Sequence, residues 1–217
     1  MSAIAMFTAA DASSIYLITD GAYYDADGRV RASKSKVTKS DRLRMAVAVT
    51  GNVDSGTVAR HLASAETQRE ALQRVPSITS NLHAANAYLW PHDDDAWHLH
   101  LMLFVATWSE DRGAEGWVCA SGRDWLGDDY VPGSLAGVSE LSSPPISDGA
   151  WLPRDPDEGA RRVLTGQRRC IDVFNGQCCV GGFGELTTVD GDGARTVRLL
   201  EWPDRIGERI SLQSDVA

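Results

Sequence analysis

Apolar residues in the first fifty positions recur in short runs separated by turn-forming residues. The runs at 2–7 and 15–19 have strand length, and the small and polar residues between them predict a hairpin. Residues 29–37 alternate long polar with small or apolar side chains, as a half-buried strand does, and residues 44–49 form an apolar run of strand length. The chain therefore opens with β structure.

Helical periodicity begins after residue 51. Apolar positions within 54–72 fall mostly at helical spacing, and we expect Pro76 to end this helix. Ser77 then caps a second helix that reaches residue 89, and a third helix covers 157–172, weakened slightly by Gly166. The candidate caps of the first helix are Asn52, Asp54 and Ser55.

β patterns return at 98–108 and 116–121, and the chain closes with strands at 183–189 and 194–202. The DGDG between the closing strands is a hairpin signal. Residues 128–156 are rich in Gly, Pro and Ser, which predicts a long loop with a short strand at 130–131. We expect the polar tail from about residue 203 to be frayed.

Strands and helices come in blocks instead of alternating, which favours antiparallel sheets with segregated helices. The predicted fold is α+β: a four-layer α/β/β/α sandwich of two antiparallel sheets, with residues 1–217 forming one domain. A chain of 217 residues with 43% hydrophobic residues is long enough to bury such a core.

Composition narrows the classes of partner. A net charge of −9 and the lack of a long basic run disfavour nucleic acid. No apolar stretch reaches the roughly 18 residues of a membrane span, so we expect a cytoplasmic protein that does not enter a membrane. We expect buried free thiols, because no spacing suggests zinc or a disulfide framework for Cys119, Cys170, Cys178 and Cys179.

Four short motifs, ITDG, SKV, AVTGN and DVFNGQ, occur within this element order. Together with the closing hairpin they resemble the β subunits of the proteasome and their bacterial relatives, which are N-terminal nucleophile (Ntn) hydrolases. The resemblance extends from about Ser2 to Leu200, although only the short motifs are specific. It implies the four-layer sandwich and the hydrolysis of an amide or peptide bond without a cofactor or metal.

The resemblance also implies a set of site residues. Asp20 ends the second strand and Lys36 follows sixteen residues later, which is the spacing of the family. Gly51 matches the glycine whose backbone N–H binds the oxyanion. The supporting residues are Ser134, a weak match in PGSLAG, and the group Asp172, Asn175 and Gly176, in which Asn175 stands where the family has serine.

The nucleophile departs from the family, whose first residue is usually threonine. Thr8 lies too close to Asp20, so Ser2 is the candidate, exposed by removal of Met1. A hydroxyl needs a base within hydrogen-bond reach, and a free α-amino group, with an unperturbed pKa of about 7.7–8.0, can accept its proton. Lys36 would lower the pKa of that amine, and Asp20 would keep the lysine charged and oriented.

Each residue also has a plain structural interpretation. Asp20 and Lys36 taken singly are a turn acid and a solvated lysine, Ser2 is an ordinary terminal residue, and Asp172 and Asn175 are helix C-cap residues. The runner-up function is an inactive subunit that acts in assembly or binding. A third possibility is a metal-dependent hydrolase using His98 and His100, although no third ligand is visible.

Three further expectations concern partners and loops. The resemblance implies a homo-oligomer, a ring or stacked rings, with any ATPase partner unknown. The DGDG segment lacks the downstream Glu of a calcium loop, so we interpret it as a turn. GGFG at 181–184 precedes a strand instead of a helix, which disfavours a phosphate site.

Overall fold

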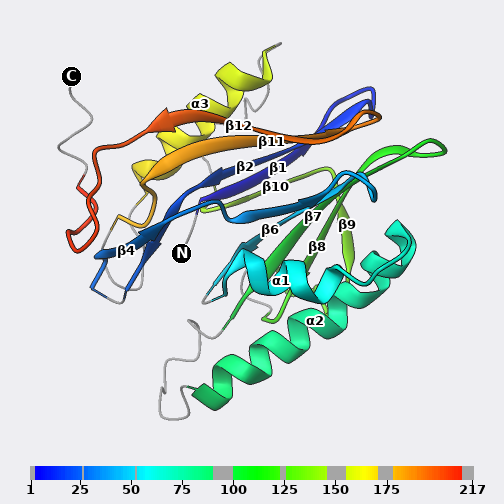
Figure 1. The fold of residues 1–217 in the computed structure, drawn as a ribbon, viewed down its shortest axis with the longest axis horizontal. Helices are drawn as coiled ribbons and strands as arrows, with labels where there is room; N and C mark the ends of the chain where they lie inside the picture. Colours follow the sequence, from blue (N-terminus) through cyan, green and yellow to red (C-terminus); the bar gives the residue numbers. More distant parts are fainter. Residues whose placement is uncertain are drawn as a thin grey trace.

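The protein is described by a computed structural model over residues 3–25, 27–51, 53–89, 100–122, 126–145, 155–170 and 178–211. In these ranges the chain is mixed α+β, with twelve strands in three antiparallel sheets and three helices (Figure 1). The predicted α+β class and antiparallel pairing are therefore confirmed. None of the helices in these ranges is long and apolar enough to cross a membrane.

The first five-stranded sheet has the order β10-β1-β2-β11-β12 and is built around two hairpins. Both were predicted: β1 pairs with β2, and β11 pairs with β12 across the DGDG turn. β11 also pairs with β2, which joins the two ends of the chain in one sheet. Its strands are β1 (Ile4–Thr8), β2 (Ser14–Asp20), β10 (Glu140–Ser143), β11 (Phe183–Asp190) and β12 (Gly193–Glu201).

The second five-stranded sheet has the order β5-β6-β7-β8-β9, and β3 pairs with β4 in a separate ribbon. The single strand predicted over 29–37 was wrong, because β4 and β5 belong to different sheets and residues 34–36 connect them. Lys36 therefore lies in the crossing segment. The strands are β3 (Ala22–Tyr24), β4 (Val30–Ser33), β5 (Val37–Ser40), β6 (Met45–Thr50), β7 (Met102–Ser109), β8 (Gly113–Ala120) and β9 (Ala136–Val138).

One apolar cluster joins the facing sides of the two five-stranded sheets. Alternate residues of β1 and β2 meet alternate residues of β6, β7 and β8, so each sheet buries one full face. Fully burying one of its Ile, Leu, Val, Met or Phe side chains stabilises the fold by roughly 1.5–3 kcal/mol. The cluster includes Ile4, Met6, Ile15, Leu17, Ala46, Ala48, Met102, Phe104 and Val118.

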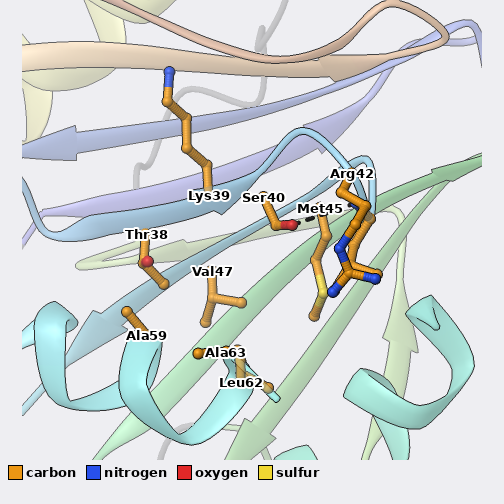
Figure 2. Close-up of a pocket in the computed structure, with 10 residues that line it drawn as sticks. Thr38, Lys39, Ser40, Arg42, Met45, Val47, Ala59, Leu62 and Ala63 are labelled. Carbon is orange, nitrogen blue, oxygen red and sulfur yellow. Dashed lines mark hydrogen bonds between the residues drawn. The ribbon is translucent and has the colours of Figure 1, made fainter. Parts of the chain in front are cut away.

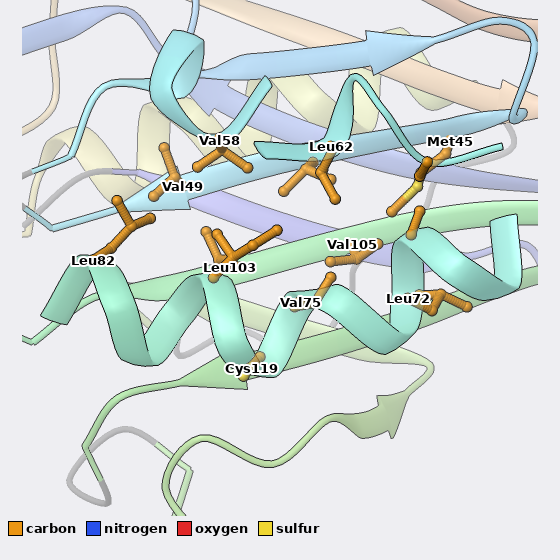
Figure 3. Packing of buried hydrophobic residues seen from close by; sticks show 14 of the residues in the cluster. Met45, Val49, Val58, Leu62, Leu72, Val75, Leu82, Leu103, Val105 and Cys119 are labelled. Atoms are coloured by element: carbon orange, nitrogen blue, oxygen red, sulfur yellow. The ribbon is translucent and has the colours of Figure 1, made fainter. Parts of the chain in front are cut away.

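The outer faces of the two sheets are covered by helices (Figure 1). α3 (Pro156–Arg168) packs Ala160, Val163 and Leu164 against the first sheet. α1 (Ser55–Leu62) and α2 (Gln68–Leu89) cover the second sheet (Figure 3). There the buried residues include Val49, Val58, Leu62, Leu72, Val75, Leu82, Leu103, Val105 and Cys119.

The predicted boundaries of the first two helices were wrong. α2 continues through Pro76, and the break falls earlier, between α1 and α2. Burial of Leu72, Val75 and Ile78 along one face offsets the hydrogen bond that proline cannot donate. The missed signal is Thr67, whose hydroxyl accepts from the Glu70 N–H and caps α2.

Asp54 and Asp155 cap α1 and α3, each accepting a backbone N–H two residues on. Two further predictions need correction. Tyr130 and Val131 form no strand, because they lie in turns closed by bonds from the Tyr130 N–H to Gly127 and from the Ser134 N–H to Val131. The strands within the predicted loop are β9 and β10 instead. The tail is not frayed over 203–211, since it hydrogen-bonds back to β4.

Candidate active site

Asp20 and Lys36 form a buried ion pair. Asp20 ends β2 and is 0% exposed, while Lys36, just before β5, is 1% exposed. Lys36 Nζ donates to Asp20 Oδ1 at 2.5 Å. The predicted contact between the two side chains is therefore confirmed, and the interpretation of Lys36 as a solvated lysine is wrong.

Backbone N–H groups provide the other contacts of the Asp20 carboxylate. Oδ1 also accepts from the Ala3 N–H at 3.0 Å, and Oδ2 accepts from Ala22 at 3.2 Å and Gly181 at 3.0 Å. All four partners donate, which is the set that an ionised carboxylate accepts. These bonds replace the water that the buried charge has lost.

Ala3 is fixed to Asp20 at both of its backbone groups. Besides the bond to Oδ1, the Ala3 carbonyl accepts from the Asp20 N–H at 3.2 Å. The Ala3 nitrogen and Lys36 Nζ therefore share one acceptor, Asp20 Oδ1. Ser2, which precedes Ala3 by one peptide bond, lies outside the described residues, as does Met1.

Gly51 follows β6 beside the segment that carries Lys36. The Val49 N–H donates to the Lys36 carbonyl at 3.4 Å, and Gly51 comes two residues later with φ at 107°. A Cβ at this position would lie 2.6 Å from the His100 carbonyl oxygen, so only glycine fits. Gly51 is exposed, and its N–H has no hydrogen-bond partner among the described residues.

Of the predicted supporting residues the structure describes only Ser134, and it does not bring this residue to the pair. The Ser134 hydroxyl donates to the Val131 carbonyl of its own turn at 2.7 Å, and the described residues show no contact between it and Asp20 or Lys36. Asp172, Asn175 and Gly176 lie outside the described residues. The roles of all four stay predictions.

Glu185 is a buried acid beside the pair that the sequence reasoning missed. It lies on β11 opposite Thr19 and is 5% exposed. Its Oε1 accepts from the Thr19 hydroxyl at 3.3 Å and from the Ser35 hydroxyl. Burial raises the pKa of the Glu185 carboxyl, and the nearby charge of Asp20 adds to the rise.

Thr19 and Ser35 immediately precede Asp20 and Lys36, so Glu185 contacts both chain segments that carry the pair. Its sequence signal is an acid inside the apolar strand FGELTTV. Such a position requires polar partners inside the protein.

The GGFG segment is explained by close packing. The Gly181 N–H donates to Asp20, and a Cβ on Gly181 would lie 2.4 Å from Asp204 Oδ2. Gly182 has φ at 75°, which glycine adopts without strain. These glycines let the chain pass between two carboxylates.

The described histidines and cysteines do not form a metal site. His98 is outside the described residues, and the ring of His100 lies 5.7 Å from that of His83. Among the described residues, no three metal-ligating side chains are grouped to hold an ion. The four cysteines are free thiols: Cys170 is half-buried, and the buried ones are Cys119, Cys178 and Cys179.

A cavity of about 270 Å³ lies between β5, β6 and α1. Figure 2 shows Thr38 and Val47 directed toward α1, whereas Lys39 points the other way. Arg42, at one end, donates to the Ala65 and Glu66 carbonyls. Neither Asp20 nor Lys36 lines this cavity, so we do not assign it to the site.

No protein-family model and no curated protein matches this chain.

Proposed function

We propose that this chain is an Ntn hydrolase of the proteasome β-subunit type, which cleaves an amide or peptide bond with Ser2 as the nucleophile. The packing of α3, two facing sheets and α1 with α2 supports the four-layer sandwich expected for that class. With this class we also propose a cytoplasmic homo-oligomer, a ring or stacked rings.

The shared acceptor Asp20 Oδ1 is the observation that carries this proposal. Lys36 Nζ and the Ala3 N–H contact the same oxygen, and the atoms of residue 2 are joined to Ala3 by the peptide bond. A nucleophile at residue 2 would thus be bonded to a residue whose N–H lies beside the ammonium of Lys36. Gly51 supplies an N–H that no described residue occupies.

The reaction follows from these groups. Once Met1 is removed, the Ser2 α-amine accepts the hydroxyl proton as Oγ attacks the substrate carbonyl carbon. Gly51 donates its N–H to the oxyanion, an interaction worth around 3 kcal/mol in comparable sites. The C–N bond then breaks, and the proton on the amine passes to the leaving amine.

The second half of the reaction hydrolyses the acyl-enzyme and regenerates the free enzyme. Water attacks the ester on Ser2, and the α-amine accepts the proton of that water. The ester C–O bond breaks, the carboxylic acid leaves, and Ser2 Oγ regains a proton from the amine. Lys36 keeps the amine neutral before each attack by disfavouring its protonation, and Asp20 fixes the ammonium of Lys36.

Mass spectrometry and labelling test this proposal. We expect the native protein to lack the mass of Met1. Phenylmethanesulfonyl fluoride should then form an S–O bond to Ser2 with loss of fluoride, and peptide mapping should locate the adduct. Ser2→Ala should prevent labelling at that position, whereas Ser13→Ala, which removes an exposed turn serine, should not. A retained Met1, or equal cleavage of a model peptide by Ser2→Ala and the parent, would refute the proposed hydrolase.

The alternative is an inactive subunit that keeps the fold for assembly or binding. The observation that favours it is the burial of the Asp20–Lys36 pair, whose side-chain exposures are 2% for Lys36 and 0% for Asp20. A purely structural ion pair has the same appearance. An unlabelled Ser2 in a folded protein without Met1 would favour this alternative.

A further inference from the structure

One donor to Asp20, the Gly181 N–H, comes from a loop whose neighbouring residues are held by a second buried ion pair. The Val180 carbonyl accepts from Arg168 Nη1 at 2.7 Å, and the Gly182 N–H donates to Asp204 Oδ2 at 2.8 Å. Three consecutive residues, 180–182, are therefore fixed in turn by Arg168, Asp20 and Asp204. The loop connects the two pairs directly.

The second ion pair, between Arg168 and Asp204, is buried and bidentate. Arg168 Nη1 and Nη2 bind Asp204 Oδ2 and Oδ1 at 2.9 and 3.0 Å, a bidentate arrangement. The side chains of Arg168 and Asp204 are 1% and 3% exposed, and the guanidinium lies 4.8 Å from the centre of the Trp202 ring. Such a pair holds a fixed geometry, because its two parallel hydrogen bonds are directional and both side chains are buried.

Asp204 reaches this position because the C-terminal segment, residues 203–211, folds back along β4 (Figure 1). The Val30 N–H donates to the Glu208 carbonyl at 2.9 Å, and the Gly207 N–H donates to the Val30 carbonyl at 2.8 Å. Arg168 Nη2 also donates to the Ser211 carbonyl at 3.1 Å. The segment is attached at several points between residues 204 and 211.

We propose that Asp204 is a positioning residue for the candidate site: with Arg168, it holds the loop 180–182 so that the Gly181 N–H fixes the Asp20 carboxylate toward Lys36. This inference rests on the proposed function, which makes Asp20 and Lys36 a catalytic pair. It makes the C-terminal segment part of the site, although no residue of that segment touches the pair in the described contacts. If the Arg168–Asp204 pair only stabilised the fold, its removal would leave the surroundings of the Lys36 ammonium unchanged.

Asp204→Asn tests this role, since it keeps the shape of the side chain and removes the charge that orients Arg168. Glu208→Gln is the matched control, because Glu208 lies in the same segment, is exposed, and contacts β4 through its backbone. Arg168→Lys is the second variant, which keeps the positive charge but removes the bidentate contact, in case Asp204→Asn does not fold.

The first readout is the NMR signals of the Gly181 amide and of Lys36 Nζ, which need no activity. We expect both to shift in Asp204→Asn or Arg168→Lys and to stay unchanged in Glu208→Gln. The second readout is the rate of Ser2 labelling by phenylmethanesulfonyl fluoride across pH. Small displacements of reacting groups are costly, so we expect this rate to fall by about tenfold or more, with a displaced pH midpoint.

The two readouts separate the possible failures. Unchanged Gly181 and Lys36 signals in folded variants overturn the positioning role, and so do an unchanged labelling rate and pH midpoint where the parent is labelled. A parent protein that is never labelled at Ser2 overturns the proposed function. In that case the NMR shifts alone decide whether Asp204 positions the Asp20–Lys36 pair.

Discussion

Two lysines, two residues apart, each pair with an aspartate in very different surroundings. Lys36 and Asp20 have side-chain exposures of 2% and 0%, whereas Lys34 and Asp54 are exposed by 50% and 40%. Both ammonium groups lie over the ring of Tyr23, at 5.5 Å for Lys36 and 4.9 Å for Lys34. The same pair of residue types thus occurs twice around one aromatic ring.

The difference lies in what surrounds each carboxylate. Asp20 accepts three backbone N–H groups and an ammonium, so removing the ammonium leaves its buried charge without the cation that compensates it. Asp54 caps α1 by accepting the Gly56 N–H at 2.7 Å, and water can replace Lys34 there. Burial, more than residue identity, separates a site from a surface contact.

The largest effect should come from Lys36→Met, which leaves the Asp20 carboxylate buried without its cation. We expect a loss of about 3–5 kcal/mol in the free energy of unfolding, together with loss of Ser2 labelling. Urea denaturation measures the first and mass spectrometry the second. A loss below about 1 kcal/mol would mean that the two pairs are energetically alike, which the burial of Lys36 argues against.

The double variant Asp20→Asn with Lys36→Met sharpens this test. Removing both charges avoids the uncompensated one, so the double variant should be more stable than the sum of the two single losses predicts. We expect a coupling energy of about 1–3 kcal/mol from a double-mutant cycle by urea denaturation. Additive losses would show that the two side chains act independently. Labelling of Ser2 should be absent in all three variants of the cycle and present in the parent.

Glu185→Gln should change how stability depends on pH. The raised pKa of Glu185 means that the folded state binds this proton more tightly than the unfolded state does. The stability that this proton contributes is present below the unfolded pKa and is lost as pH rises through the folded pKa.

Gln cannot lose that proton, so Glu185→Gln should gain stability relative to the parent as pH rises from about 4 toward 7. Urea denaturation at several pH values measures the difference. Glu158→Gln, which changes an exposed acid of α3, is the matched control, and it should not reproduce this gain. A parallel curve for Glu185→Gln itself would contradict the prediction.

The smallest effect should come from Lys34→Met. This exposed pair is screened by water and salt, so we expect a change of about 0.2–1 kcal/mol in the free energy of unfolding, decreasing at high salt. Asp54 keeps its capping bond to Gly56 in this variant. A change as large as that of Lys36→Met, or one that salt leaves untouched, would show that exposure does not distinguish the two pairs.

The sequence was informative where one local signal decides the structure. Turn residues between apolar runs predicted both hairpins, and the resemblance to proteasome β subunits, through the matching spacing of Asp20 and Lys36, predicted their contact. It was misleading where tertiary burial competes with local preference. Pro76 stays inside α2 because the apolar face on either side of it is buried against the second sheet.

Contacts distant in sequence could not be predicted from local patterns. Glu185 meets Thr19 only because β11 lies beside β2, and the C-terminal segment is held by Arg168 and by hydrogen bonds to Val30. Neither is marked by a spacing or a motif. The sequence showed Gly181 as part of a glycine cluster. Only the folded structure shows why glycine is required there, because the backbone passes closely between Asp20 and Asp204.

The anchoring of Ala3 has a practical consequence for producing the protein. Ala3 is 0% exposed, and both of its backbone groups are bonded to Asp20. Under the proposed function, a tag fused ahead of Ser2 would keep its amine acylated, one residue from this buried anchor. Purification handles therefore belong away from Ala3, where neither of its bonds to Asp20 is disturbed.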